Sequence, residues 1–277
     1  MKIPEFKIRT DLALEEREGL KEAAEEVSGV SFKKWEGKRS AAQITEVKVL
    51  NEHGAKALGK PMGSYLTLEA DKLPDEDFHS EVSDELALLL KGLLKQKTGK
   101  NILVAGLGNQ SVTPDSLGPR TVSNLCVSAE GLKAIAPGVM AQTGMETARI
   151  LLGIIKEVQP DLVIAIDALA ARSIRRLGTT IQLTDTGIHP GSGVGNHRHS
   201  LTKETLGIPV LAIGVPTVVG AAAIVHDTIS ALLGVLSSQA ETKNTGKWIQ
   251  NMDPEDQYRL ITELLEPEFG SLYVTPP

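Results

Sequence analysis

The sequence predicts an α/β protein with three layers, in which a mostly parallel central sheet lies between two layers of helices. Two short apolar runs, residues 102–105 and 162–166, are typical of buried strands, and strand and helix patterns alternate between residues 102 and 236. Only 3% of the 277 residues are aromatic, so the core must be built mainly from Val, Ile, Leu and Ala, which suits a parallel sheet covered by helices. We expect one α/β domain over residues 12–277, preceded by an arm over residues 1–11.

The first third of the chain predicts an acidic segment, two strands and a helix. Residues 11–27 mix apolar side chains with acidic ones, which indicates an exposed helix or a mobile arm. Residues 41–50 and 64–70 alternate between apolar and polar side chains, so we expect two strands at an antiparallel edge of the main sheet. Residues 75–97 carry leucines at helical spacing, with lysines in the last turns that oppose the helix dipole.

The remaining elements are indicated by caps, proline positions and apolar runs. Pro119 favours a helix over residues 117–127, because the first turn of a helix tolerates a missing N–H. Thr143 and Glu146 have the spacing of a capping box, which predicts a helix over residues 143–158. We expect further strands over residues 161–166, 179–183 and 209–215, and further helices over residues 202–206, 217–236 and 254–265.

Composition argues against several classes of protein. The net charge of −6 argues against binding to a phosphate backbone as the main activity, since that needs basic patches. The single cysteine, Cys126, rules out an internal disulfide, and its apolar neighbours indicate a buried structural thiol. The first ten residues lack the apolar core of a signal peptide, and no apolar run reaches the roughly 18 residues that a bilayer span needs. We therefore expect a cytoplasmic protein with no direct nucleic-acid partner and no membrane partner.

Two aspartates follow predicted strands, at the sheet edge where α/β proteins place their sites. Asp115 lies in a Pro- and Gly-bounded loop after strand 102–105, and Asp167 closes the run 162–166. Each also has a structural interpretation, Asp115 as the N-cap of the helix after it and Asp167 as the N-cap of a helix over residues 168–176. Asp167 is the stronger functional candidate, because a carboxylate in apolar surroundings is costly unless it is paired, bound or protonated.

Two short motifs suggest chemistry less specifically. Residues 106–109 (Gly-Leu-Gly-Asn) resemble the start of a dinucleotide fingerprint, but the third glycine before a helix is missing, so a tight turn is favoured. Residues 185–187 (Asp-Thr-Gly) match the active triplet of pepsin-like proteases. Those enzymes are all-β and need two copies, whereas one copy stands here within an α/β pattern, so a turn is favoured.

Residues 187–199 form a long glycine-rich loop that fits the wall of a cleft. Gly191 and Gly193 would let a peptide backbone approach closely. Ser192 lacks the context of a nucleophile elbow, which argues against a serine hydrolase. The loop contains three histidines, which keep a metal site open although no His-Glu-x-x-His spacing accompanies them: His189, His197 and His199.

Longer motifs resemble the spore germination protease family over nearly the whole chain. The segments that carry the resemblance are residues 9–13, 101–109, 113–120, 136–140, 160–172, 185–196, 207–210 and 214–218. The resemblance implies an endopeptidase with a fold similar to that of hydrogenase maturation proteases. It also implies that the substrates are small acid-soluble proteins that protect spore DNA, that the enzyme is a homotetramer in the spore core, and that it uses neither a cofactor nor a metal.

The resemblance assigns roles to four residues of this sequence. The family's two essential aspartates fall on Asp115 and Asp167. Residues 11–15 (Asp-Leu-Ala-Leu-Glu) are similar to the family's cleavage pattern, which places self-cleavage of a zymogen between Asp11 and Leu12. Residues 1–11 would then be a propeptide arm.

Two close carboxylates cannot both ionise cheaply, so they would share one proton. We expect the more apolar Asp167 to hold that proton and Asp115 to be the general base for water, with activity on the acid side of neutral. Arg172, Arg175 and Arg198 are candidates to bind the acidic flanks of a substrate. Two alternatives stay open: a metal-assisted maturation protease, and a non-catalytic module that binds a nucleotide or a peptide.

Overall fold

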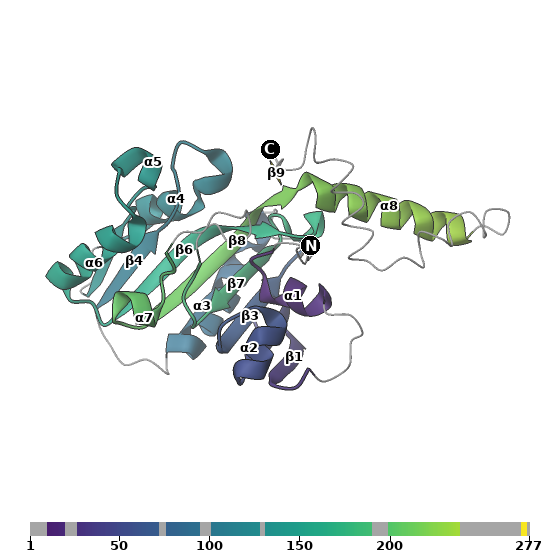
Figure 1. Ribbon diagram of the computed structural model, residues 1–277, viewed down its shortest axis with the longest axis horizontal. Coiled ribbons are helices and arrows are strands. Elements are labelled where there is room, and N and C mark those ends of the chain that lie inside the picture. The colour runs from purple at the N-terminus through teal and green to yellow at the C-terminus, as the bar shows by residue number, and fades with distance from the viewer. Residues whose placement is uncertain are drawn as a thin grey trace, which may run out of the picture.

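A computed structural model describes residues 10–19, 27–71, 76–94, 101–127, 131–189, 199–238 and 273–275. These residues form one mixed sheet with helices on both faces (Figure 1). The strands are β1 (Val30–Glu36), β2 (Gln43–Val49), β3 (Gly63–Glu69), β4 (Ile102–Gly106), β5 (Leu132–Ile135), β6 (Leu162–Ala171), β7 (Thr180–Thr184), β8 (Val210–Gly220) and β9 (Tyr273–Val274). The α-helices are α1 (Ala13–Gly19), α2 (Glu52–Leu58), α3 (His79–Leu94), α4 (Leu117–Asn124), α5 (Met140–Thr143), α6 (Thr147–Val158), α7 (Lys203–Leu206) and α8 (Ala221–Ser238). Short 3₁₀ turns are η1 (Glu76–Phe78), η2 (Thr113–Asp115) and η3 (Ile174–Arg176).

The sheet combines a parallel block with an antiparallel extension, in the order β1-β2-β3-β7-β8-β6-β4-β5. The strands β5, β4, β6 and β8 run parallel to one another. The strands β7, β3, β2 and β1 continue the sheet as antiparallel neighbours beyond β8, and β9 pairs antiparallel with β8. The predicted α/β class is confirmed, as is the antiparallel edge predicted over residues 41–50 and 64–70.

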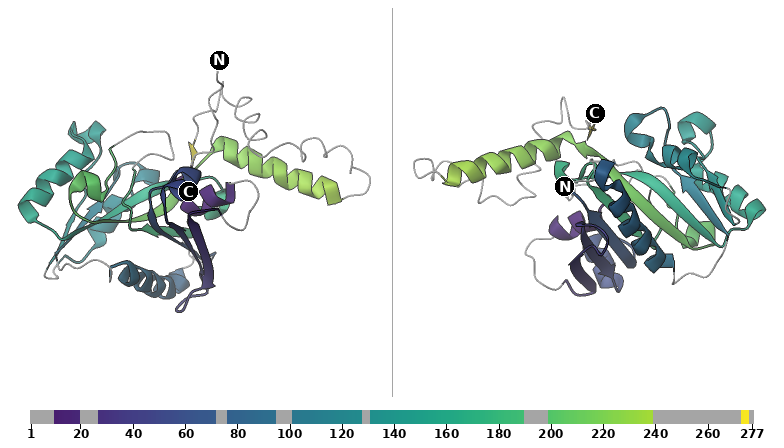
Figure 2. Two further views of the ribbon diagram at one scale, coloured as in Figure 1. Left: turned by 60° about the horizontal axis from the view of Figure 1, so that its bottom comes forward. Right: turned by 180° about the vertical axis from the view of Figure 1, so that it is seen from behind.

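Alternating side chains on the central strands build two apolar layers. Leu162, Ile164 and Ile166 of β6 point to the face that α3 and α4 cover, which we call the α3 face. Val163 and Ala165 point to the opposite face, which α6 and α7 cover and which we call the α6 face. Figure 2 shows α3 lying across its face of the sheet, while α8 projects beyond the sheet from the end of β8. No helix among the described residues is both long enough and apolar enough to cross a membrane.

Three predicted elements differ from those observed. β6 continues to Ala171, so the helix over residues 168–176 and the N-cap interpretation of Asp167 are wrong; the run of small apolar residues after Asp167 extends the strand instead. The helix predicted over residues 143–158 begins four residues later, as α6 at Thr147, because Thr143 ends the separate short helix α5 and Gly144 adopts a left-handed φ of 67°. Its N-cap is Glu146 instead of Thr143.

Three further predictions concern single positions or ranges. Cys126 is exposed, so the prediction of a buried thiol is wrong. β8 runs on to Gly220, so the helix predicted from residue 217 begins four residues later, at Ala221. The predicted helix over residues 254–265 lies outside the described residues.

The N-terminal segment, residues 10–19, is docked on the sheet, so the predicted exposed arm is wrong for its first residues. Leu12 and Ala13 are fully buried, and Leu12 belongs to the apolar core of the α6 face. The N–H of Asp11 donates to the carbonyl oxygen of Ala170 (3.0 Å), and the N–H of Ala170 donates to the Asp11 carboxylate (2.9 Å). The segment therefore continues along the end of β6 before α1 begins.

A buried carboxylate anchors the first turn of α1. Glu15 is 2% exposed and accepts hydrogen bonds from the N–H groups of Arg172 (2.7 Å) and Ser173 (3.0 Å) and from the Thr10 hydroxyl. Its second oxygen lies 3.2 Å from Nε of Arg176. Burial raises the pKa of Glu15, and these donors and the cation offset part of that rise. Arg176 also pairs with Glu18 and Glu69, and so ties α1 to β3.

Glycine allows α4 to lie directly on the backbone of β4 and β6. A Cβ atom on Gly118 would lie 2.3 Å from the carbonyl oxygen of Leu107 and 2.5 Å from that of Ile166. Both contacts are with backbone, which cannot give way as a side-chain end can. Any larger residue at position 118 must therefore displace α4, and with it the turn before α4.

We expect Gly118→Ala to destabilise the fold by about 1–3 kcal/mol, because the added methyl group overpacks against rigid backbone. The matched control is Gly153→Ala in α6, where an added Cβ would meet nothing within 4 Å. That change should stabilise the protein by about 0.5–1 kcal/mol, since alanine favours a helix. Urea unfolding of both variants measures the difference, and equal stabilities would contradict the packing argument.

We expect Arg176→Met to lower the free energy of unfolding by about 3–5 kcal/mol, because it leaves the buried Glu15 carboxylate without its cation. Arg175 is exposed and adjacent, so Arg175→Met should stay within about 0.5 kcal/mol of the wild type. Thermal or urea unfolding gives both values. An Arg176→Met variant as stable as Arg175→Met would show that the pair does not anchor α1.

Candidate active site

The turn after β4 is folded around Asp115. The N–H of Asn109 donates to Oδ2 of Asp115 (2.8 Å) and to its carbonyl oxygen (3.0 Å). Gly108 makes this possible, since its φ is 112° and a Cβ there would lie 2.0 Å from the Asp115 carbonyl oxygen. The N-cap of α4 is Ser116. The N-cap interpretation of Asp115 is therefore wrong, because its carboxylate bonds back to the turn.

This turn packs on the parallel block beside Asp167. The Thr217 hydroxyl of β8 donates to the carbonyl oxygen of Pro114 (2.7 Å), and the N–H of Leu107 donates to that of Ile166 (2.8 Å). η2 thus contacts both β6 and β8. The turn that carries Asp115 and the strand that carries Asp167 are in direct contact.

Asp167 is a buried carboxylate inside β6, one position past the point where β4 ends. Gly106, the last residue of β4, pairs with Ile166. Asp167 is 5% exposed, and its Oδ1 accepts the N–H of Ala168 (2.9 Å). Strand alternation places it on the α6 face, with Val163 and Ala165. The prediction that Asp167 ends its strand is therefore wrong, because the strand that ends at this level is the neighbour, β4.

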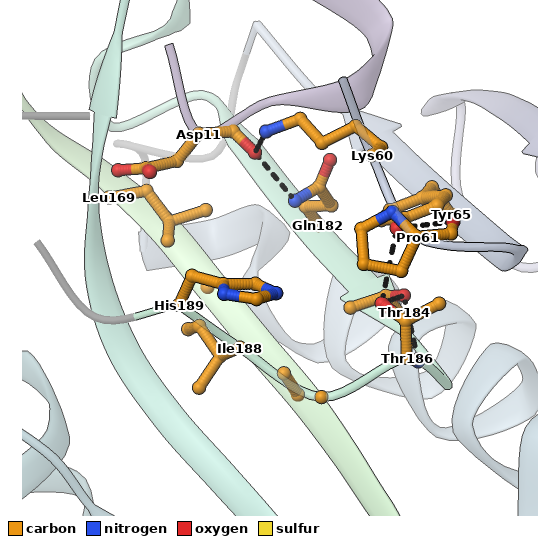
Figure 3. A pocket seen from close by; sticks show the side chains of 13 residues that line it. Asp11, Lys60, Pro61, Tyr65, Leu169, Gln182, Thr184, Thr186, Ile188 and His189 are labelled. Atoms are coloured by element: carbon orange, nitrogen blue, oxygen red, sulfur yellow. Dashed lines mark hydrogen bonds between the residues drawn. The ribbon is translucent and has the colours of Figure 1, made fainter. Parts of the chain in front are cut away.

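A pocket opens on the α6 face, next to the docked N-terminal segment (Figure 3). Its floor is apolar and includes Gly214, which pairs with Asp167 across β8 and β6. Its walls are polar. The lining residues are Asp11, Lys60, Pro61, Tyr65, Leu169, Gln182, Thr184, Thr186, Gly187, Ile188, His189, Ala212 and Gly214.

The predicted cleavage point lies at this pocket. Asp11 lines it, and Leu12 is fully buried next to it. The carbonyl oxygen of Asp11 accepts hydrogen bonds from Nζ of Lys60 (3.0 Å) and Nε2 of Gln182 (3.3 Å). Asp11 is held at Ala170, three positions beyond Asp167 along β6, which corresponds to about 10 Å of strand.

Tyr65 forms one polar wall of the pocket. Its hydroxyl donates to the carbonyl oxygen of Pro61 (2.9 Å) and accepts from the Thr186 hydroxyl (3.2 Å). Burial raises the pKa of Tyr65 to about 12, with Asp185 adding to the rise. Asp185 accepts the N–H of Ser64 (2.8 Å), which agrees with a turn role for the Asp-Thr-Gly triplet.

Of the other residues predicted to bind substrate, the structure describes only some. Arg172 contacts the Glu15 carboxylate through its backbone N–H. The guanidinium that pairs with Glu15 belongs to Arg176. Arg175 is exposed. Gly191, Gly193, Arg198 and His197 lie outside the described residues.

The two histidines of the glycine-rich loop that the structure describes have different surroundings. His189 lines the pocket, where partial burial and the Lys60 ammonium lower its pKa. His199 pairs with Glu146 at the surface. Within the described residues, no three His, Cys, Asp or Glu side chains are grouped so that they could hold a metal ion.

Sequence reasoning missed Lys60, Gln182 and Arg176. Gln182 had a readable signal, since Thr180, Gln182 and Thr184 alternate with buried Ile181 and Leu183 and mark a polar stripe on one face of β7. Lys60 and Arg176 had no such signal in the sequence. Lys60 lies about 50 residues from its partner Asp11, and Arg176 lies about 160 residues from its partner Glu18.

We expect one tyrosine to titrate near pH 12 in an absorbance titration at 295 nm, and to be missing in Tyr65→Phe. Because the folded pKa exceeds the ordinary value near 10, the contribution of Tyr65 to stability is complete below pH 10. It is lost as the pH rises towards 12, by about 2–3 kcal/mol. The alkaline loss of stability should therefore be smaller in Tyr65→Phe. Identical titrations of the two proteins would contradict the burial of this hydroxyl.

Comparison with known proteins assigns the chain to a family. A sequence model described as "Germination protease" matches residues 8–252. A germination protease of Caldanaerobacter subterraneus subsp. tengcongensis is 49% identical over 97% of this chain and 87% of its own length, and one of Clostridium perfringens is 41% identical over 98% and 89%. A solved [NiFe] hydrogenase maturation protease, HycI of Thermococcus kodakarensis, aligns with 47% of this chain and 80% of its own at 21% identity and a TM-score of 0.34. The chain therefore belongs to the germination protease family and is a peptidase of spore germination.

Proposed function

We propose that the chain is an endopeptidase that uses Asp115 and Asp167 as general base and general acid, and that it first cleaves itself between Asp11 and Leu12. The observation that carries this proposal is the contact between the Asp115 turn and β6, where Asp167 is buried on the face to which residues 10–12 are docked. Two carboxylates on adjoining elements and a peptide strand on the same sheet are the parts that hydrolysis requires.

The proposed chemistry assigns each aspartate by its surroundings. Asp115 is half-buried in a polar turn and accepts an N–H, so it serves as the ionised base that takes a proton from water. The hydroxide adds to the carbonyl carbon of residue 11, and the carbonyl electron pair moves to oxygen. Asp167, which is nearly enclosed, holds the shared proton and gives it to the nitrogen of residue 12 as the C–N bond breaks. One carboxyl group and one amine result.

The wider proposal follows the family resemblance. Residues 1–11 are the propeptide arm that leaves, and residues 12–277 are the protease domain. The substrates are small acid-soluble proteins that protect spore DNA, cleaved by a homotetramer in the spore core. Such proteins need no unfolding by the protease when they are off the DNA, because they are then unfolded.

We expect the wild-type chain to cut itself after Asp11 on acid incubation, as N-terminal sequencing of the product will show. Asp115→Asn and Asp167→Asn should slow this reaction by about 10²–10⁴-fold, since each removes a proton-transfer group. Asp84→Asn, an exposed change on α3, is the matched control and should process at the wild-type rate.

The outcomes separate this proposal from its alternatives. Full processing by Asp167→Asn would contradict the assignment of the acid. Processing that stops with chelator and returns with added metal would indicate a metal-assisted protease. A wild-type chain that neither cuts itself nor cleaves a peptide of residues 6–18 at any pH would favour a binding module.

A further inference from the structure

Two polar side chains outside the aspartate pair contact the peptide group proposed for cleavage. Nζ of Lys60 and Nε2 of Gln182 both donate to the carbonyl oxygen of Asp11, at 3.0 and 3.3 Å. Lys60 is half-buried and also donates to the preceding carbonyl, that of Thr10, at 3.3 Å. A cation and an amide therefore converge on one backbone oxygen at the edge of the pocket (Figure 3).

Gln182 holds the chain on both sides of Leu12. Its Nε2 donates to the carbonyl oxygen of Asp11, and its Oε1 accepts the N–H of Ala13 at 2.8 Å. One side-chain amide thus fixes the carbonyl of the residue before the cut and the N–H two residues later. We call these two hydrogen bonds the Gln182 clasp. Because Gln182 is only 6% exposed, they are shielded from competing water.

The sheet register aligns this clasp with Asp167. Gln182 of β7 and Asp167 of β6 both pair with Gly214 of β8, so the three residues stand in one row across the sheet. Strand alternation points Gln182 and Asp167 to the same α6 face, roughly two strand spacings or 10 Å apart at Cα. Gly214 places no side chain between them, and the Leu169 side chain fills the space above it.

From these contacts we infer that Lys60 and Gln182 bind and stabilise the oxyanion that forms on the carbonyl oxygen of residue 11; the inference rests on the proposed self-cleavage. When hydroxide adds to the carbonyl carbon, negative charge develops on the oxygen that these two donors already contact. Donors placed in advance at that oxygen cost no reorganisation during the reaction.

The test is the first-order rate of self-processing, which contains no binding step in trans. Lys60→Met removes the cation and keeps the stem, and Gln182→Glu keeps the acceptor for the Ala13 N–H but replaces the donor. We expect each to slow processing by about 10²–10³-fold. Lys60→Arg, which keeps a cationic donor, should restore most of the rate, and Lys56→Met, an exposed change on α2, should leave it unchanged.

A second readout separates chemistry from anchoring. Hydrogen exchange at the Ala13 amide reports whether residues 10–15 stay docked. Slow processing by Lys60→Met with the Ala13 amide still protected supports the inference. Processing at the wild-type rate by both Lys60→Met and Gln182→Glu overturns it. A second result would also overturn it: hydrogen exchange at the Ala13 amide that rises, in both variants, in proportion to the loss of the processing rate. Lys60 and Gln182 would then only hold the segment in place.

The two proposals fail in different ways. Wild-type processing that requires Asp115 and Asp167 but not Lys60 or Gln182 leaves the proposed function intact and removes this inference alone. A wild-type chain that stays intact removes both.

Discussion

The close backbone contact between α4 and the parallel strands determines where Asp115 lies. Gly118 rests on the backbone of Leu107 and Ile166 with no room for a Cβ atom, and η2 stands immediately before it in the chain. Since Ile166 is the neighbour of Asp167, one contact without side chains fixes the distance between two elements that carry carboxylates. The glycine at position 108 then turns the Asn109 N–H onto the Asp115 carboxylate. The candidate site thus depends on backbone packing before it depends on any ionic interaction.

The N-terminal segment holds the peptide bond proposed for cleavage against this scaffold. Its polar anchors are the ion pair of Glu15 with Arg176, the hydrogen bonds of Asp11 to the Ala170 backbone, and the hydrogen bonds of Gln182 to Asp11 and Ala13. Leu12 adds an apolar side chain to the core, so the bond proposed for cleavage lies within a packed structure instead of on a loose arm. A substrate tethered in this way loses little further entropy on reaching the transition state, which is the advantage that an intramolecular reaction has over one in trans.

Much of the scaffold could be predicted from local pattern. The apolar runs of β4, β6 and β8 and the alternation in β2 and β3 identify strands, because burial on a sheet imposes a period that a sequence shows directly. Asp115 and Asp167 could be singled out as residues adjoining such runs. The helix expected after Asp167 was wrong because Ala168–Ala171 are compatible with both states, and pairing with β8 decides for a strand. Lys60 and Arg176 depend on contacts between distant segments, which no local pattern encodes. For Gln182 the alternation in β7 indicates a polar face but not the partners in residues 11–13.

The central claim is that Asp115 and Asp167 act as one unit on one water molecule and one peptide bond. The most direct measurement is the processing rate of the double variant Asp115→Asn/Asp167→Asn compared with those of the two single variants. Groups that share one catalytic step are strongly non-additive, so the double variant should be about as slow as the slower single variant. A double variant whose loss is the product of the two single losses would show that the aspartates act independently, and would contradict the account.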